Sequence, residues 1–325
     1  MKHLCLLFLI LTLTSCFRPS KDKEAEQEEP QGFSSLYDQG NTSACWIYAM
    51  LTCIEREQAI TGDTVILSRH WLIAKGMEEH TRRIYQMHAN GYDITGPDKD
   101  RRMAFTMRGV GPEAIRLINR YGLIPYEYER THVTNDRMAI RRLTQVATTA
   151  TSPDDLEEKM HDILPQFTVA RHTYGSNSPS FYYYSMRYTP QQFAASIMYH
   201  QQWQFYASEQ MHPWGDTFAL ETPDNYRYHE YMNLPIDSIA SMVMTSLRKG
   251  HPVYWEYGKR GRTSDHAMAI IGIKYDKKTH EPLLLCQNSY GLRWGNHGCC
   301  AVTLDYFKTH TSNVGILNSA IFSEK

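Results

Sequence analysis

The segment Gln39–Trp46, Q-G-N-T-S-A-C-W, opens the part of the chain that decides the fold. It runs into Cys45–Ile60, where apolar residues recur at helical spacing and charged residues gather late, which predicts a largely buried helix beginning at Cys45. A thiol in the first turn of a helix lies at the positive end of the helix dipole, which favours the thiolate and lowers its pKa. Gln39 lies six residues upstream in a glycine-containing loop, where its side-chain amide and the Cys45 N–H could form an oxyanion hole.

Two later segments carry the side chains that a reactive thiol needs. In Ser264–Gly272, S-D-H-A-M-A-I-I-G, His266 stands at the head of an apolar strand, where a base can be held rigidly. In Gln287–Gly295, Q-N-S-Y-G-L-R-W-G, the amide of Asn288 is suited to accept from the far ring nitrogen of this histidine and so orient it.

Each segment alone is ordinary, but the order Gln–Cys–His–Asn with these flanks resembles the papain-like cysteine peptidases. The matching motifs are Q-G-x-x-x-x-C-W, D-H-A-x-x-x-x-G and N-S-Y-G-x-x-W-G-x-x-G. The resemblance implies that Cys45 is the nucleophile, His266 the general base and acid, Asn288 the orienting group and Gln39 an oxyanion donor. It also implies hydrolysis of peptide bonds through an acyl-enzyme, with a thiolate–imidazolium pair as the reacting group.

Three positions can be compared with the family pattern. Thr42 stands where papain-type enzymes have a cysteine that closes a disulfide, so that bridge cannot form here. Tyr290 replaces the tryptophan that shields the Asn–His hydrogen bond, and we expect it to shield less well. Trp294 matches the family's second tryptophan.

The spacing points to one branch of the family. Cys45 and His266 lie 221 positions apart, against roughly 130–150 in papain itself. The bleomycin hydrolase branch has such an enlargement, and we expect it around residues 130–235 as a helical insertion in a peptidase domain spanning 33–325. Members of that branch are often aminopeptidases, because a C-terminal arm blocks one side of the cleft. Here Leu317–Lys325 is long enough to reach inward.

The remaining patterns predict an α+β protein with a papain-like, two-lobed fold. A helical left lobe would carry the nucleophile, and a β-barrel-like right lobe would carry the histidine and asparagine. Further helices are expected near Leu67 with Ser68 as N-cap, over Glu113–Tyr121 closed by Gly122, and over Ile236–Lys249 closed by Gly250. Short strands are expected at Pro252–Tyr257, Ala267–Ile273, Leu283–Gln287 and Cys300–Leu304.

The N-terminal residues have the features of a targeting signal. Residues 1–15 form a signal peptide whose apolar stretch ends in Leu13-Thr14-Ser15-Cys16, which resembles a bacterial lipobox with Cys16 as the lipidated residue. Ordinary cleavage with a chance cysteine is the alternative. Residues 16–32 are polar and charged, as in a flexible tether. We therefore expect a lipid-anchored protein of the bacterial cell envelope, at the outer membrane.

Composition excludes several other classes. The 34 basic and 35 acidic residues nearly cancel, so the chain lacks the basic excess of a nucleic-acid binder. No cofactor or metal is expected, because the spacing of Cys286, His297, Cys299 and Cys300 fits no zinc motif. The expected partners are a peptide or protein substrate and, through Cys16, membrane lipid. Two alternatives stay open: an inactive papain-fold surface binding protein, and an amidase or acyltransferase acting on a non-protein amide.

Overall fold

The computed structural model describes residues 38–92, 104–133, 135–167, 179–210, 231–261 and 264–322. Its contacts divide the chain into Met1–Phe33 and Ser34–Lys325, and all of the described residues belong to the second unit. The expected signal peptide, Cys16 and the charged tether therefore lie outside the described residues. None of the helices within the described ranges is long and apolar enough to cross a membrane.

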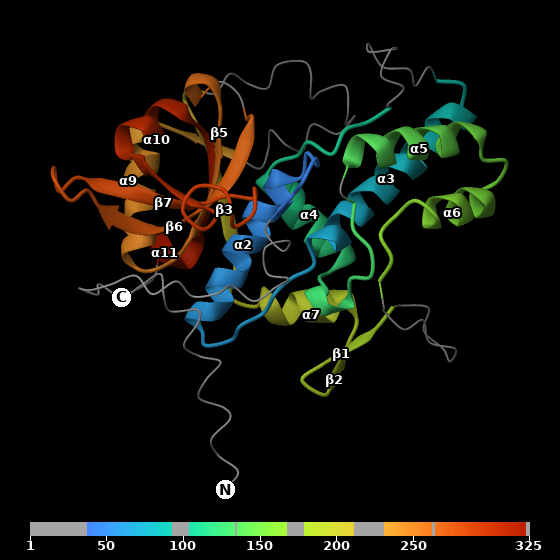
Figure 1. The fold of residues 1–325 in the computed structure, drawn as a ribbon, viewed down its shortest axis with the longest axis horizontal. Helices are drawn as coiled ribbons and strands as arrows, with labels where there is room; N and C mark the ends of the chain where they lie inside the picture. Colours follow the sequence, from blue (N-terminus) through green and yellow to red (C-terminus); the bar gives the residue numbers. More distant parts are fainter. Residues whose placement is uncertain are drawn as a thin grey trace, which may run out of the picture. The chain divides into compact units, whose positions relative to one another are not determined.

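Most of the helices gather in one lobe, built around the buried helix α2 (Figure 1). These helices are α2 (Cys45–Ile60), α3 (Arg69–Ala89), α4 (Gly111–Tyr121), α5 (Asp136–Thr149), α6 (Pro153–His161) and α7 (Pro190–Ile197), with a 3₁₀ turn η2 (Tyr126–Tyr128). α2 packs against α3 and α4, and α3 packs against α5.

Local capping explains where these helices begin and end. The hydroxyl of Ser68 accepts a hydrogen bond from the Trp71 N–H and so caps α3, as expected from the sequence. Gly122 closes α4 with φ +73°, and a Cβ at this position would lie 2.1 Å from the carbonyl carbon of Pro190. Only glycine satisfies both conditions, so Gly122 also sets how closely α7 approaches α4.

The second lobe is a seven-stranded sheet in the order β4-β3-β9-β5-β6-β7-β8, with β4 and β8 at its edges. Its strands are β3 (Trp203–Ser208), β4 (Tyr231–Leu234), β5 (Val253–Tyr257), β6 (His266–Tyr275), β7 (Pro282–Gln287), β8 (Cys299–Thr303) and β9 (Thr311–Leu317). The other elements of this lobe are α9 (Ile236–Arg248), the 3₁₀ turn η3 (Lys259–Gly261), α10 (Leu304–His310) and α11 (Asn318–Phe322). All of its pairs are antiparallel except β3 with β4.

The two faces of the sheet are covered by different helices. Alternation along β5 and β6 sends Tyr254 and Ala269 into the core around α2, and Trp255 and Ile270 into the core around α9. The helix α11 packs against α9 and β9, with Ala320 fully buried in the α9 core. The C-terminal segment through Phe322 therefore belongs to the face of the sheet opposite α2.

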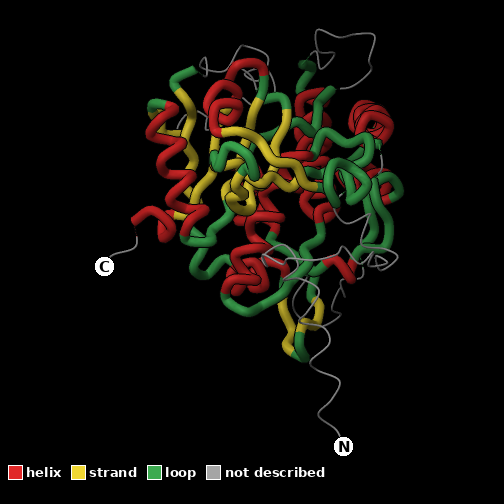
Figure 2. The backbone as a smooth tube through the Cα atoms, turned by 60° about the vertical axis from the view of Figure 1, so that its left-hand side comes forward, coloured by secondary structure: helices red, strands yellow, loops and turns green. Residues whose placement is uncertain are grey.

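The range 130–235, where a helical insertion was expected, holds more than helices. It contains α5, α6 and α7, the hairpin of β1 (Phe181–Tyr183) and β2 (Met186–Tyr188), and the two sheet strands β3 and β4. The hairpin stands apart from the large sheet in both views (Figures 1 and 2). The expected α+β architecture, with a helical lobe and a large sheet, is confirmed.

Candidate active site

The loop Gln39–Ala44, named the nucleophile loop for the role that the sequence predicts for Cys45, leads into Cys45 at the wall of a small cavity. Cys45 is the first residue of α2, is half-buried, and lines a cavity of about 170 Å³ together with Gln39 and His266. The helix has no side-chain cap at Ala44, so its first backbone N–H groups remain available beside the sulfur. The sequence therefore folds so that a thiol, an amide and an imidazole face one space.

Trp46, the next residue, holds another part of the cavity wall. Its indole N–H donates to the carbonyl of Met107 at 2.8 Å. A Cβ added to Gly109 would lie 2.5 Å from the indole ring, so the backbone of Arg108–Val110 runs directly along it. This segment lines the cavity, and the exposed side chain of Arg108 stands at its rim.

The histidine is held in one tautomer. His266 is the first residue of β6, and its Nε2 lies 2.7 Å from Oδ1 of the buried Asn288. Because a carbonyl oxygen only accepts, Nε2 must carry the proton, and in the neutral ring the lone pair is then on Nδ1. Nδ1 is the atom that can take a proton from a thiol in the shared cavity.

Aromatic rings cover this histidine. The ring of Tyr290 stacks on His266 with centroids 4.8 Å apart and an interplanar angle of 23°, and Trp294 meets Tyr290 edge-on at 6.0 Å. Tyr290 is itself 46% exposed. The tyrosine thus occupies the expected shielding position over the imidazole, with one side open to solvent.

Gln39 is anchored from three directions. Its side-chain NH₂ donates to the Thr42 carbonyl at 2.6 Å, its side-chain oxygen accepts from the Ser289 hydroxyl, and its backbone N–H donates to the Ser289 carbonyl at 2.8 Å. An amide NH₂ carries two hydrogens, so one remains for a ligand in the cavity. Ser289 was not predicted as a site residue. Because it follows Asn288 directly, one dipeptide holds both His266 and Gln39 in place.

A buried carboxylate that was also not predicted ties the two sides of the cavity together. Glu256 on β5 is 1% exposed. One of its oxygens accepts from the Gly111 N–H at 2.9 Å and the Tyr254 hydroxyl at 2.8 Å; the other accepts from Ser264 and from Asn313 at 2.9 Å. Gly111 directly follows Arg108–Val110, the segment that lines the cavity, and Ser264 lies two residues before His266. The Glu256 carboxylate therefore holds both the Arg108–Val110 segment and the start of β6 in place. A lone glutamate in an apolar strand is the sequence signal that could have indicated it.

A second contact holds the nucleophile loop from the helical lobe. The buried carboxylate of Asp136, at the start of α5, accepts from the Ser43 N–H at 2.5 Å, and Asn135 pairs with Asn41 as an isolated bridge. The Thr42 hydroxyl donates a hydrogen bond to the backbone carbonyl of Gln39 at 2.8 Å. Hydrogen bonds therefore restrain the loop around Thr42, where papain-type enzymes have a disulfide-forming cysteine.

The electrostatics differ from the sequence expectation. Burial raises the pKa of the Cys45 thiol to about 11, against backbone hydrogen bonds from Ala267 and Trp46 that lower it. Burial also lowers the pKa of His266, against the Asn288 bond, which raises it. The expected lowered thiol pKa is therefore wrong for these surroundings: both shifts favour a neutral thiol beside a neutral imidazole.

The structure thus brings most of the expected residues to one place. Gln39, Cys45, His266 and Tyr290 line the cavity, Asn288 lies behind the histidine, and Trp294 lies at the edge of the tyrosine. Cys16 lies outside the described residues. Phe181–Tyr184, a run of four aromatic residues, lies at the β1–β2 hairpin, where Phe181 and Tyr183 pack on Phe193.

Comparison with solved structures identifies the architecture. No family model matches the sequence, and no curated protein matches it. PepW from Lactobacillus rhamnosis HN001 superposes with a TM-score of 0.55 at 15% identity, covering 90% of this chain and 81% of that one. The chain has the papain-like fold. Weaker likenesses are SERA5E from Plasmodium falciparum (TM-score 0.41, 14% identity, covering 89% and 92%) and the ragweed Amb a 11 cysteine protease proform (0.38, 15%, 86% and 61%).

Proposed function

We propose that the protein is a cysteine-type peptidase. The observation that carries the proposal is the 2.7 Å bond from His266 Nε2 to Asn288, which leaves Nδ1 as the base in a cavity shared with Cys45. Gln39, anchored beside the same cavity, supports acyl transfer in particular, because this reaction develops negative charge on a carbonyl oxygen.

The neutral resting pair favours a general-base route over a preformed ion pair. As the Cys45 sulfur forms its bond to the substrate carbonyl carbon, the thiol proton passes to Nδ1 of His266. The remaining Gln39 side-chain hydrogen and the Cys45 N–H bind the oxyanion. Imidazolium then protonates the leaving amine as the C–N bond breaks. Water attacks the thioester with His266 again as the base, which releases the acid and restores the thiol.

The backbone of Arg108–Val110, which lines the cavity, supports a peptide as substrate. Within the described residues, the N–H and carbonyl of Gly109 take part in no hydrogen bond, and this half-buried backbone runs beside the nucleophile. An extended peptide can pair with such a backbone as an added strand. We therefore propose that the substrate lies along Arg108–Val110 with its scissile carbonyl at Cys45.

An aminopeptidase would need a group that blocks one end of the cleft. The C-terminal segment Leu317–Lys325 is long enough to reach inward, but its described part, Leu317–Phe322, packs against α9, on the face of the sheet opposite α2. We therefore propose cleavage of N-blocked as well as free peptides. A fluorogenic peptide supplied in both forms tests this, and cleavage of the free form alone would indicate an aminopeptidase.

Substitution of the nucleophile tests the main proposal. Cys45→Ala is expected to abolish hydrolysis of a peptide library, with the fold checked by circular dichroism. Cys53→Ala is the matched control, because this buried thiol lies on the same helix away from the cavity and should leave the activity intact. Equal hydrolysis by the parent and Cys45→Ala would exclude the assignment.

The raised thiol pKa favours one alternative, an inactive surface protein that binds peptides in the same cleft. A parent protein that binds library peptides without cleaving any of them would establish this second function.

We also propose that Cys16 is lipidated and anchors the protein to the outer membrane of a bacterial envelope. Mass spectrometry of the N-terminal peptide should detect a diacylglycerol thioether on Cys16. Cys16→Ser should move the protein from the detergent phase to the aqueous phase. An unmodified Cys16 in membrane-extracted protein would exclude the anchor.

A further inference from the structure

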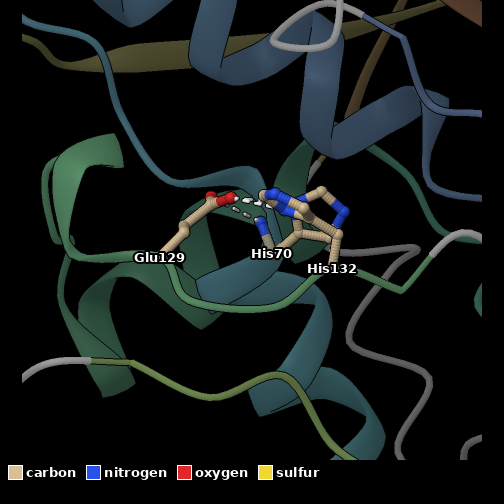
Figure 3. Close-up of side chains that lie close together, drawn as sticks. All are labelled: His70, Glu129 and His132. Atoms are coloured by element: carbon tan, nitrogen blue, oxygen red, sulfur yellow. Dashed lines mark hydrogen bonds and ion pairs between the residues drawn. The ribbon is translucent and has the colours of Figure 1, made fainter.

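Three side chains that the proposed peptidase does not use converge in the helical lobe. His70 lies in the first turn of α3, Glu129 directly follows η2, and His132 lies in the loop before α5 (Figure 3). One carboxylate oxygen of Glu129 is 3.1 Å from Nδ1 of His70 and 2.9 Å from Nδ1 of His132, and the two ring nitrogens are 3.3 Å apart. The three atoms therefore form a nearly equilateral triangle.

This triangle has the size of one face of a metal coordination sphere. Zinc bonds to imidazole nitrogen and carboxylate oxygen at about 2.0–2.1 Å, which puts neighbouring tetrahedral ligand atoms about 3.3 Å apart. Atoms 2.9–3.3 Å apart lie about 1.8 Å from the centre of their triangle, so an ion slightly above its plane reaches all three at bonding distance. Two imidazoles and a carboxylate are also a donor set that Zn²⁺ and similar divalent ions accept.

The contacts of the cluster suit a cation. Without one, the Nδ1 atoms of His70 and His132 both face the same carboxylate oxygen of Glu129, and they also face each other at 3.3 Å. One divalent ion bonded to these three atoms would let both imidazoles direct a lone pair toward the centre of the cluster.

The carboxylate is oriented from behind. The Ser68 hydroxyl hydrogen-bonds to Glu129, and the backbone N–H of His70 approaches its second oxygen at 3.4 Å. Outer partners of this kind are what fix a ligating carboxylate in metal sites. The Glu129 side chain is 1% exposed whereas that of His132 is 42% exposed, so the cluster is anchored on one side and open to entering ions on the other.

We propose that His70, Glu129 and His132 bind one divalent transition-metal ion, of which zinc is the best fit, with solvent completing its coordination. The ion would fasten residues 129–133 to the start of α3. A few residues further on, Asp136 accepts from the Ser43 N–H of the nucleophile loop. The bound metal therefore acts as a structural staple whose stiffening extends to the loop that carries Cys45.

The test uses the full chain with Cys45→Ser, so that the reactive thiol cannot bind metal and the result does not depend on peptidase activity. After chelator treatment, calorimetric titration with Zn²⁺ should give one site per chain. His132→Ala and, separately, Glu129→Gln should weaken binding at least tenfold. His161→Ala is the matched control, because this histidine is 62% exposed and lies outside the cluster, and it should bind zinc like the parent.

Two further readouts separate this site from its rivals. The Co²⁺-loaded protein should show ligand-field absorption without a thiolate-to-cobalt charge-transfer band, which excludes the cysteines as ligands. Hydrogen exchange of the peptides covering 41–45 and 129–133 should slow on zinc addition in the His161→Ala control and not in His132→Ala. Zinc binding that is absent, or unaffected by both cluster variants, would overturn the site. Binding without slower exchange would overturn the staple.

Discussion

The charge state of Cys45 can be tested by following its alkylation with pH. Burial raises the pKa of this thiol to about 11, so at pH 7 the thiolate fraction is on the order of 10⁻⁴. A free cysteine with a pKa of about 8.5 has roughly 3% thiolate at the same pH. Because iodoacetamide reacts with the thiolate, Cys45 should be alkylated ~300-fold more slowly than free cysteine, and its rate should rise about tenfold per pH unit from 7 to 10.

An internal comparator makes this measurement robust. Cys300 is half-buried, and a hydrogen bond from Cys286 lowers its pKa, so at pH 7 it should be alkylated before Cys45. Mass spectrometry of peptides from a timed iodoacetamide reaction gives both rates in one sample. A Cys45 rate that is flat between pH 5 and 8 and exceeds that of Cys300 would refute the reasoning. The helix dipole and His266 would then outweigh burial and hold a thiolate–imidazolium pair.

Four substitutions test the groups around the thiol. Asn288→Ala removes the acceptor that fixes the tautomer of His266, and kcat/KM should fall about 10²-fold or more with KM little changed. Ser289→Ala removes the hydrogen bond that holds the Gln39 side chain, so kcat should fall. The fall should be smaller than the roughly 10²–10³-fold loss expected when an oxyanion donor is removed outright, which Gln39→Ala would show. Glu256→Gln turns nitrogen toward two of four donors, and urea unfolding should show a loss of about 2–4 kcal/mol. A loss below ~0.5 kcal/mol would contradict the inference that all four hydrogen bonds to the Glu256 carboxylate stabilise the fold.

The pH dependence of hydrolysis follows from the imidazole. His266 must be neutral to act as a base, and burial lowers its pKa from the ordinary value of 6.5. The acidic limb of the kcat/KM profile should therefore lie below pH 6.5, so activity persists into mildly acidic solution. An acidic limb above pH 6.5 would indicate that the histidine is stabilised in its charged form.

Elements with local signals could be predicted closely from the sequence. α2 begins at Cys45 as expected, Ser68 caps α3, and glycines follow the ends of α4 and α9. Each of these boundaries depends on residues within a few positions of it, such as a side-chain cap or a glycine at positive φ. The strands β5 to β8 were also anticipated to within one or two residues, because turns rich in glycine, aspartate and lysine separate them.

The strands that were not predicted owe their existence to distant partners. β9 lies near the middle of the sheet, between β3 and β5, and all seven of its residues are buried. A strand covered on both faces lacks the alternation by which strands are recognised. β3 pairs with β9 across about 110 positions, and the range around it has only weak periodicity. Its place was decided by the fold and not by its own composition.

The same distinction separates the predicted site residues from those that were missed. Cys45, His266 and Asn288 stand in recognisable motifs, so their roles could be inferred before their geometry was known. Glu256 has no such flanks, because its partners come from three separate parts of the chain. The histidine–glutamate–histidine cluster likewise assembles only when the turn after η2 folds back on α3.

The nucleophile loop shows why these unpredicted contacts matter for function. It carries no disulfide, since Thr42 occupies that position, yet it must hold Gln39 and Cys45 in fixed relation. Two contacts hold the loop: the Ser289 hydroxyl of the sheet lobe donates to the Gln39 side chain, and the Asp136 carboxylate of the helical lobe accepts from the Ser43 N–H. Because a buried hydrogen bond to a charged group contributes about 1.5–3 kcal/mol, the second contact can rival the usual effect of a disulfide only if the start of α5 is itself rigid. A metal ion bound a few residues upstream would supply that rigidity. The proposed metal site would then help to restrain the loop that the absent disulfide leaves unrestrained.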